Sequence, residues 1–220
     1  MLADYHVHSG FSDDSSYPLR QVALDAERLN LDEVCFTEHI DYGVKPEWNQ
    51  PDTARFEDGR PVTNCPYIPY LDELGRTQEE IHRAYYEELL GVVECFRDYS
   101  VLGHLDLIRR YDPFARETGP YPFGRVRDLV AEIPRRVIED GKGIEVNTSG
   151  IRYGLGDFQP AREVLELYRD LGGTVVTVGS DSHRPEHLGS YLRRAYRELE
   201  ELGFAGVWTF SRGAGTLVRF

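Results

Sequence analysis

Short apolar runs alternate with amphipathic stretches along most of this 220-residue chain. Runs rich in β-favouring residues are bounded by polar or glycine-containing segments, which is typical of strands. Parallel strands need a crossover between each pair, so strands that alternate with helices predict a parallel sheet or barrel of the α/β class. The predicted strands are 3–8, 33–37, 100–102, 143–147, 174–178 and 206–210.

Helices are predicted where hydrophobic positions recur every three to four residues after a start signal. Pro18 stands where the first turn of a helix would begin, followed by apolar residues at helical spacing. Thr77 and Glu80 form a capping box, which opens a helix to about Phe96 by satisfying free N–H groups. Further helices are expected at 124–139, 160–171 and 186–202.

One segment interrupts this alternation. Residues 43–76 are rich in Pro, Asp, Asn and Gly, which predicts an irregular connection with at most a short helix at 67–74. No internal repeat is present, and single α/β domains commonly reach this length. We therefore expect one domain spanning 1–220, with 43–76 as an irregular segment within it.

Charge, cysteine content and hydropathy indicate which partners and which cellular compartment to expect for this protein. A net charge of -13 argues against nucleic-acid binding, which usually needs a basic surface. Cys35, Cys65 and Cys95 are odd in number and far apart, which indicates reduced thiols. The first residues have no basic and apolar leader, and no run reaches the length of a membrane span. We expect a cytoplasmic protein without a nucleic-acid or membrane partner.

Histidine and acidic residues cluster where predicted strands end. Five of the seven histidines lie there, and the carboxyl ends of parallel strands share one rim. Residues two apart in a strand face the same side, so each His-x-His or Asp-x-His pair points into one pocket. Imidazoles and carboxylates ligate divalent metals, so the pattern predicts a site for several ions. The clusters are His6-Val7-His8, Thr37-Glu38-His39, Gly103-His104-Leu105-Asp106 and Ser180-Asp181-Ser182-His183.

Several neighbouring residues have two interpretations. Asp14 is either a metal ligand or the N-cap of the helix that begins near Pro18. Glu38 and Asp106 are candidates for hydrogen bonding to metal-bound imidazoles. His82 and His187 fall on predicted helices, where a solvent-facing position is expected, and we place both outside the site.

Arginines also follow the strand ends, and guanidinium groups bind phosphate oxygens through paired hydrogen bonds. Each could equally form a surface ion pair. Asn147 ends a strand and either faces the same rim or forms a turn. Bound metals would turn water into a nucleophile for phosphate-ester hydrolysis, while motifs of serine hydrolases, P-loop NTPases and thiol proteases are missing. The arginines are Arg109, Arg110, Arg152 and Arg184.

Taken in order, H-V-H, F-S-x-D-S, T-E-H, G-H-L-D, E-V-N-T-S-G and S-D-S-H resemble the polymerase and histidinol phosphatase (PHP) superfamily, and its histidinol-phosphatase branch in particular. The resemblance implies a distorted βα barrel with up to three Zn, Mn or Fe ions at its carboxyl rim. It also implies hydrolysis of the small substrate L-histidinol phosphate in histidine biosynthesis. The metal ligands it implies are His6, His8, Asp14, His39, His104, Asp181 and His183.

Within this resemblance, Arg110, Asn147 and Arg152 correspond to segments that line the substrate pocket. Arg110 or Arg152 would stabilise charge on the phosphoryl group during hydrolysis.

The chain departs from the family between His39 and His104, which are 65 residues apart. A Gly-x-Glu motif with a bridging glutamate and a Ser-x-His motif are not found there. Two βα units of about 30 residues each are thus missing. We expect a shortened or incompletely closed barrel whose open edge a second copy could cover. The alternatives are a metal-binding remnant without catalysis and an esterase for another small phosphate ester.

Overall fold

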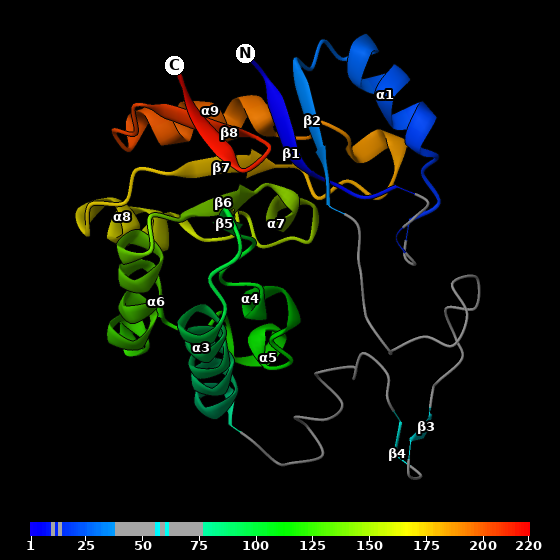
Figure 1. Cartoon of the computed structure of the whole chain (residues 1–220). Helices are drawn as coiled ribbons and strands as arrows, with labels where there is room; N and C mark the ends of the chain where they lie inside the picture. Colours follow the sequence, from blue (N-terminus) through cyan, green and yellow to red (C-terminus); the bar gives the residue numbers. More distant parts are fainter. Residues whose placement is uncertain (10–11, 13–14, 38–55, 58–59, 62–76) are drawn as a thin grey trace.

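The structure is a computed structural model that describes residues 1–9, 12, 15–37, 56–57, 60–61 and 77–220. Within these residues, parallel strands alternate with helices, which confirms the predicted α/β class (Figure 1). Five parallel strands form two sheets in the orders β1–β2 and β5–β6–β7. Their bounds are β1 (Ala3–Val7), β2 (Glu33–Phe36), β5 (Val101–Leu102), β6 (Gly143–Asn147) and β7 (Val176–Gly179).

Backbone hydrogen bonds join the end of β1 to the segment that follows β7. The amide of His8 donates to the carbonyl of Ser182 at 2.7 Å, and the amide of Ser182 donates to the carbonyl of His6 at 3.2 Å. The strands therefore follow one another in the order β2, β1, β7, β6, β5, with their carboxyl ends on one side. Over the described residues, they do not close into a barrel.

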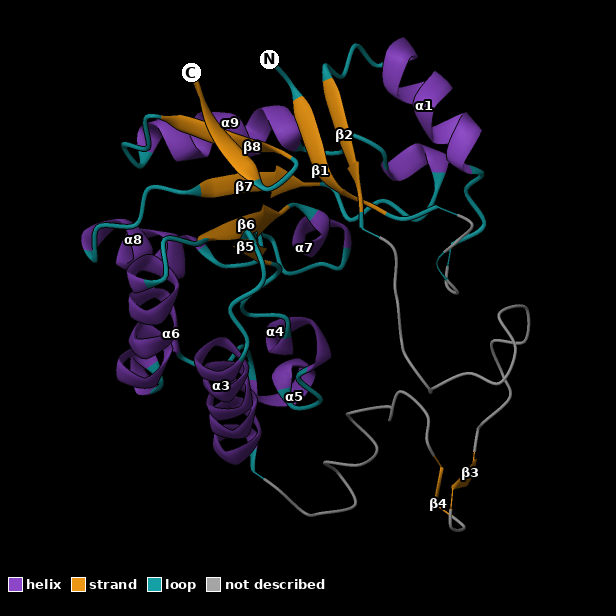
Figure 2. Cartoon of the chain, viewed as in Figure 1, coloured by secondary structure: helices purple, strands orange, loops and turns teal. Residues whose placement is uncertain are grey.

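Figure 2 shows α3, α6 and α8 gathered beside the β5–β6–β7 sheet. The predicted capping box is confirmed, because the Thr77 hydroxyl accepts from the amide of Glu80 while the Glu80 carboxylate accepts from the amide of Thr77. The longer helices are α1 (Leu19–Arg28), α3 (Gln78–Cys95), α6 (Arg127–Glu139), α8 (Arg162–Asp170) and α9 (Leu192–Glu201). Short helical turns occur at α4 (Ile108–Tyr111), α5 (Ala115–Thr118), α7 (Ser149–Arg152), η1 (Phe123–Arg125) and η2 (Pro185–His187).

The single helix predicted over 186–202 is wrong, because η2 ends at His187 and α9 begins at Leu192. Gly189 and Tyr191 have φ values of +70° and +62°, a left-handed backbone that a continuous α-helix cannot contain. The amide of Gly189 instead donates to the Oδ2 atom of buried Asp4 at 3.0 Å.

The last predicted strand is the first half of a hairpin. β8 (Gly206–Ser211) pairs antiparallel with β9 (Ala214–Arg219). Arg212 and Gly213 both have positive φ, which the two-residue turn between twisted strands requires.

The irregular segment predicted at 43–76 lies mostly outside the described residues, and so does the helix expected at 67–74. The described part of this segment is a two-residue pairing between β3 (Phe56–Glu57) and β4 (Arg60–Pro61).

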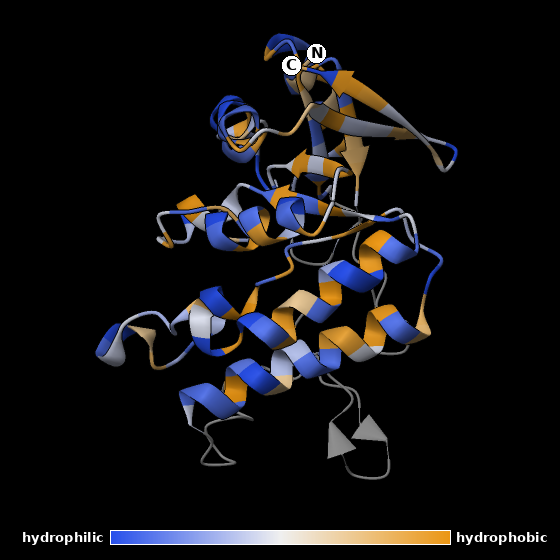
Figure 3. Cartoon of the chain, turned by 90° about the vertical axis from the view of Figure 1, so that its left-hand side faces the viewer, coloured by the Kyte–Doolittle hydropathy of each residue, from blue (hydrophilic) through white to orange (hydrophobic). Residues whose placement is uncertain are grey.

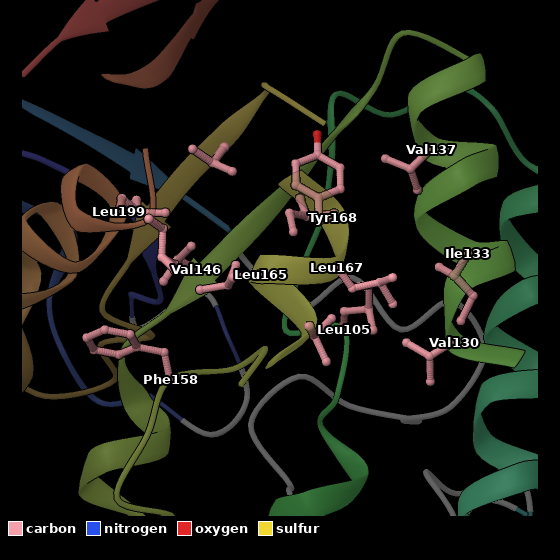
Figure 4. Close-up of a cluster of buried hydrophobic side chains, with 14 of the residues drawn as sticks. Leu105, Val130, Ile133, Val137, Val146, Phe158, Leu165, Leu167, Tyr168 and Leu199 are labelled. Carbon is pink, nitrogen blue, oxygen red and sulfur yellow. The ribbon is translucent and has the colours of Figure 1, made fainter. Parts of the chain in front are cut away.

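The main hydrophobic core lies between β6 and the surrounding helices (Figure 4). The helices α6, α8 and α9 each turn an apolar stripe inward, and Figure 3 shows hydrophobic and hydrophilic residues alternating around the helices. Removing these side chains from water stabilises the fold and fixes the strand ends that carry the site. Leu105, Val130, Ile133, Val146, Phe158 and Leu165 are among the fully buried side chains.

A smaller apolar cluster seats α1 beside the end of β1. It consists of Val7, Tyr17, Val22, Ala26 and Leu188. Among the described residues, no helix is both long and apolar enough to cross a bilayer.

Candidate metal centre

A pocket of about 320 Å³ opens at the carboxyl ends of the strands. Its walls come from β1, from the segments that follow β5 and β7, and from α4 and the end of α7, so the predicted rim is where the histidines meet. The lining residues are His6, His8, His104, Leu107, Arg110, Tyr111, Tyr153, Asp181, His183, Arg184 and His187.

Three side chains in this pocket have the spacing of metal ligands. The Nε2 atoms of His6 and His8 lie 3.0 Å apart, as period two in β1 predicts. The Oδ1 atom of Asp181 lies 3.5 Å from the first and 3.4 Å from the second. All three ligand atoms lie within 4.8 Å of one another, so the donor set and its spacing fit a divalent ion.

Two more predicted histidines line the same pocket. The ring of His183 stacks on that of His8, with 4.0 Å between centroids, and its Nδ1 is 3.0 Å from the carbonyl oxygen of Asp181. The ring of His104 is 5.5 Å from that of His6. The structure thus brings together four of the predicted histidines and Asp181, whereas Asp14, Glu38 and His39 lie outside the described residues.

Glu145 also belongs to this group, although the sequence reasoning missed it. It is 2% exposed, in the middle of β6. Its Oε1 is 2.5 Å from Nδ1 of His6, and its Oε2 accepts from the amide of His104 at 2.9 Å. A carboxylate among fully buried strand residues is a signal that could have found it, because an unpaired buried charge is strongly unfavourable.

The ionisable side chains of this site shift one another's pKa values. Burial alone would lower the pKa of His6, but the carboxylates of Glu145 and Asp181 outweigh it and raise that pKa to about 9. Burial opposes ionisation of Asp181, but the surrounding imidazoles, beginning with His8, bring its pKa well below the usual range. Burial lowers the pKa of His104 and favours its neutral form. The Asp181 carboxylate is thus ionised beside imidazoles that carry protons. A divalent cation could take the place of those protons.

The loop that carries Asp181 is fastened from two sides. Asp181 has a φ of +54°, and its Oδ2 accepts from the Ser149 hydroxyl at 3.0 Å. The guanidinium of Arg152 donates to the carbonyl oxygens of Ser180 at 2.6 Å and Asp181 at 2.8 Å. Arg152, predicted to bind substrate, therefore uses both terminal nitrogens to hold this loop.

Asp4 fastens the same loop from β1. Its carboxylate accepts from the amide of Ser180 at 2.7 Å, from the Ser180 hydroxyl, and from the amide of Gly189 at 3.0 Å. Burial raises the pKa of Asp4, and the hydrogen bonds oppose that rise. The side chain joins the strand with the paired histidines to the loop with Asp181.

Two of the predicted arginines line the pocket, and Arg110 is the one that lies beside Asp181. Its guanidinium carbon lies 3.2 Å from the ring centre of Tyr153 and 5.0 Å from that of Tyr111. One of its terminal nitrogens is 4.0 Å from Oδ2 of Asp181. Arg184, an exposed residue, also lines the pocket.

Asn147 and Asp106 are buried behind the rim. The Asn147 amide nitrogen is 3.3 Å from Oε2 of Glu145, and its Oδ1 accepts from the Ser149 amide. Asp106 was a candidate partner for an imidazole, but its Oδ2 accepts from Arg109 at 3.0 Å and from a backbone amide. Arg109 thus belongs to this ion pair.

Two histidines differ from their predicted solvent-facing positions. His82 is 3% exposed, its Nε2 lies 3.0 Å from Oδ2 of Asp112, and its ring stacks on Tyr121. The inward face of α3 packs against the α4–α5 segment, which explains this burial. His187 is half-buried in the pocket wall, because the chain turns at Gly189 before the last helix begins.

Comparison with known proteins relates this arrangement to one family. The PHP domain model matches residues 4–74. A probable histidinol-phosphatase of Thermotoga maritima is 28% identical over 228 residues, which cover 92% of this chain and 93% of that protein. A histidinol-phosphatase of Lactococcus lactis is 28% identical over 255 residues, which cover 94% of each.

The fold is that of solved histidinol phosphatases. The Lactococcus lactis histidinol phosphate phosphatase, solved with zinc, L-histidinol and phosphate, matches with a TM-score of 0.74 at 23% identity, covering 98% of each chain. A putative histidinol phosphatase from Listeria monocytogenes matches with a TM-score of 0.65 at 16% identity, covering 86% of this chain and 98% of that one. Both sequence alignments exceed the 220 residues of this chain, so each relative has residues without a counterpart here.

Proposed function

Because the chain carries a PHP domain and shares its fold with a histidinol phosphate phosphatase, we propose that it is a metal-dependent phosphomonoesterase that hydrolyses L-histidinol phosphate to L-histidinol and phosphate, a step of histidine biosynthesis. One observation carries the proposal: the metal-ligand set of His6, His8 and Asp181 lies in one pocket with Arg110. A cation site beside a guanidinium group suits a phosphate ester. The remnant and the esterase for another substrate are not favoured, since relatives matching over 90% of this chain are named histidinol-phosphatases.

The cofactor of this reaction is a set of divalent metal ions. His6, His8 and Asp181 would hold one ion, and His104 and His183 are placed to hold others. Asp14 and His39 complete the proposed ligand set by resemblance. When bound, such ions supply Lewis acidity toward a phosphoryl oxygen and lower the pKa of water toward neutrality.

The protein directs one ring proton on each of two histidines away from the atoms that would bind metal. The Nδ1 proton of His6 is directed at Glu145, and that of His183 at the carbonyl oxygen of Asp181. On His6, this leaves Nε2 as the nitrogen that faces His8 and Asp181, so a metal ion there would take the place of the Nε2 proton. The Oδ2 atom of Asp181 accepts from Ser149, which leaves Oδ1 toward the histidines.

We propose different roles for Arg110 and Arg152 in the reaction of the substrate. Arg110 would bind the phosphate and stabilise its developing charge, since its guanidinium lines the pocket. Arg152 would act through the Ser180–Asp181 backbone that it holds, and Asn147 through Glu145. Arg152 and Asn147 would thus position other residues of the site and would not contact the substrate themselves.

The proposed activity is tested by phosphate release from L-histidinol phosphate after chelation and addition of Mn²⁺ or Zn²⁺. His8→Ala and Asp181→Asn should each lower kcat/KM by about 100-fold or more, because loss of a ligand exceeds the 10- to 100-fold effect of a residue that supports one. Asp98→Asn, at an exposed position on the segment before β5, is the matched control and should keep wild-type turnover. Equal turnover in wild type and His8→Ala would refute the proposed site.

A homodimer stays a prediction. Within the described residues, β2 pairs only with β1, and β5 pairs only with β6, so each has an edge that a second copy could cover. Light scattering tests it: a dimer mass is expected at micromolar concentration, and a monomer mass contradicts it.

A further inference from the structure

We infer that Glu145 is a positioning residue of the proposed metal centre, which sets the ring nitrogen that His6 offers to the metal. This inference rests on the metal site of the proposed function. It adds a residue outside the ligand set given by the motifs, and it assigns that residue a task distinct from coordination.

The contacts of Glu145 join three strand ends. From β6, its Oε1 reaches Nδ1 of His6 on β1 at 2.5 Å. Its Oε2 accepts from the amide of His104, after β5, at 2.9 Å and from Nδ2 of Asn147 at 3.3 Å. His104 has a φ of +27°, an uncommon backbone conformation for a side-chain-bearing residue, and this hydrogen bond helps to hold it. One carboxylate therefore places two of the predicted ligands relative to each other.

The contact with His6 determines its tautomer. An ionised carboxylate only accepts hydrogen bonds, so the proton of neutral His6 sits on Nδ1. The lone pair is then on Nε2, the atom that lies 3.0 Å from Nε2 of His8 and 3.5 Å from Oδ1 of Asp181. A carboxylate on the opposite ring nitrogen also makes the imidazole a stronger ligand.

The geometry separates this role from that of a ligand. Glu145 contacts His6 at Nδ1, whereas the ligand atoms of His8 and Asp181 gather at Nε2. The set with ligand spacing among the described residues is His6, His8 and Asp181.

The surrounding backbone leaves room for this carboxylate. A Cβ added to Gly179 would lie 2.5 Å from Oε1 of Glu145 and 2.2 Å from the Cβ of His6. A Cβ added to Gly103 would lie 3.4 Å from Oε2. Glycine at 179 is therefore what permits β7 to pass beside the His6–Glu145 pair.

The test measures zinc binding to chelated, substrate-free protein by calorimetry, in wild type, Glu145→Gln and Glu145→Asp. The Glu145→Gln substitution removes the negative charge of the side chain. The Glu145→Asp substitution keeps the charge but moves the carboxylate away from His6 by the length of one methylene group. Each variant should bind zinc about 10- to 100-fold more weakly with the same number of ions, as expected for a residue that supports a ligand. Glu139→Gln, whose side chain is 68% exposed on α6, should match wild type. Unchanged affinity in a folded Glu145 variant, or the loss of one ion per chain, would overturn the inference.

A second readout needs no variant, should both substitutions prevent folding. Nitrogen-15 NMR of the zinc-loaded wild type should show the His6 proton on Nδ1 and the metal on Nε2, whereas the opposite assignment overturns the inference. Neither measurement involves turnover. A wild type that binds zinc through His6 but does not release phosphate would instead refute the proposed function alone.

Discussion

The guanidinium carbon of Arg110 lies 3.2 Å from the ring centre of Tyr153, while Tyr111 flanks it at 5.0 Å. Both rings lie within cation–π distance of the guanidinium, and one of its terminal nitrogens lies 4.0 Å from Oδ2 of Asp181. A substrate phosphate would thus meet a cation whose orientation is set in advance.

Arg110→Gln should lower kcat/KM for L-histidinol phosphate by about 10- to 100-fold, the effect of losing a charged hydrogen bond. Arg110→Lys should not restore it, because an ammonium group neither stacks on the rings nor forms paired hydrogen bonds. Steady-state kinetics checks both, with exposed Arg116→Gln as control. Values within twofold of wild type for Arg110→Gln would remove Arg110 from substrate binding.

Gly179→Ala should damage the site through packing alone. The added methyl group would meet the Cβ of His6 at 2.2 Å and Oε1 of Glu145 at 2.5 Å. We expect the free energy of unfolding to fall by about 1–3 kcal/mol, together with weaker zinc binding. Gly124→Ala is the control, because a Cβ there meets nothing within 4 Å. Urea unfolding and calorimetry measure both effects, and equal behaviour of the two variants would disprove the tight contact.

The strand ends and their histidines could be predicted from sequence because they depend on local patterns. Period two places His6 and His8 side by side, and parallel strands bring Asp181 to the same rim. The capping box at Thr77 was equally local.

What the sequence did not reveal depends on contacts between distant segments. Glu145 was missed because its partner His6 is 139 residues away. The burial of His82 depends on how α3 packs against the segment with Asp112, which helix periodicity alone does not specify. Arg152 follows a strand as a phosphate-binding arginine would, yet its hydrogen bonds go to backbone carbonyls.

His82 predicts a pH dependence outside the metal site. Burial lowers its pKa in the folded protein below the ordinary 6.5, outweighing Asp112. The unfolded chain therefore binds this proton more tightly, so the stability from neutral His82 is present above pH 6.5 and is lost as the pH falls below it. Urea unfolding of chelated protein from pH 8 to 5 should show a steeper loss in wild type than in His82→Gln. Parallel curves would contradict this assignment.

The most direct test of the account is anomalous diffraction from crystals soaked with zinc and phosphate. We expect an ion bonded to Nε2 of His6, Nε2 of His8 and Oδ1 of Asp181, with phosphate between the metal centre and the guanidinium of Arg110. An active protein whose zinc binds elsewhere, leaving these three atoms without an ion, would contradict it.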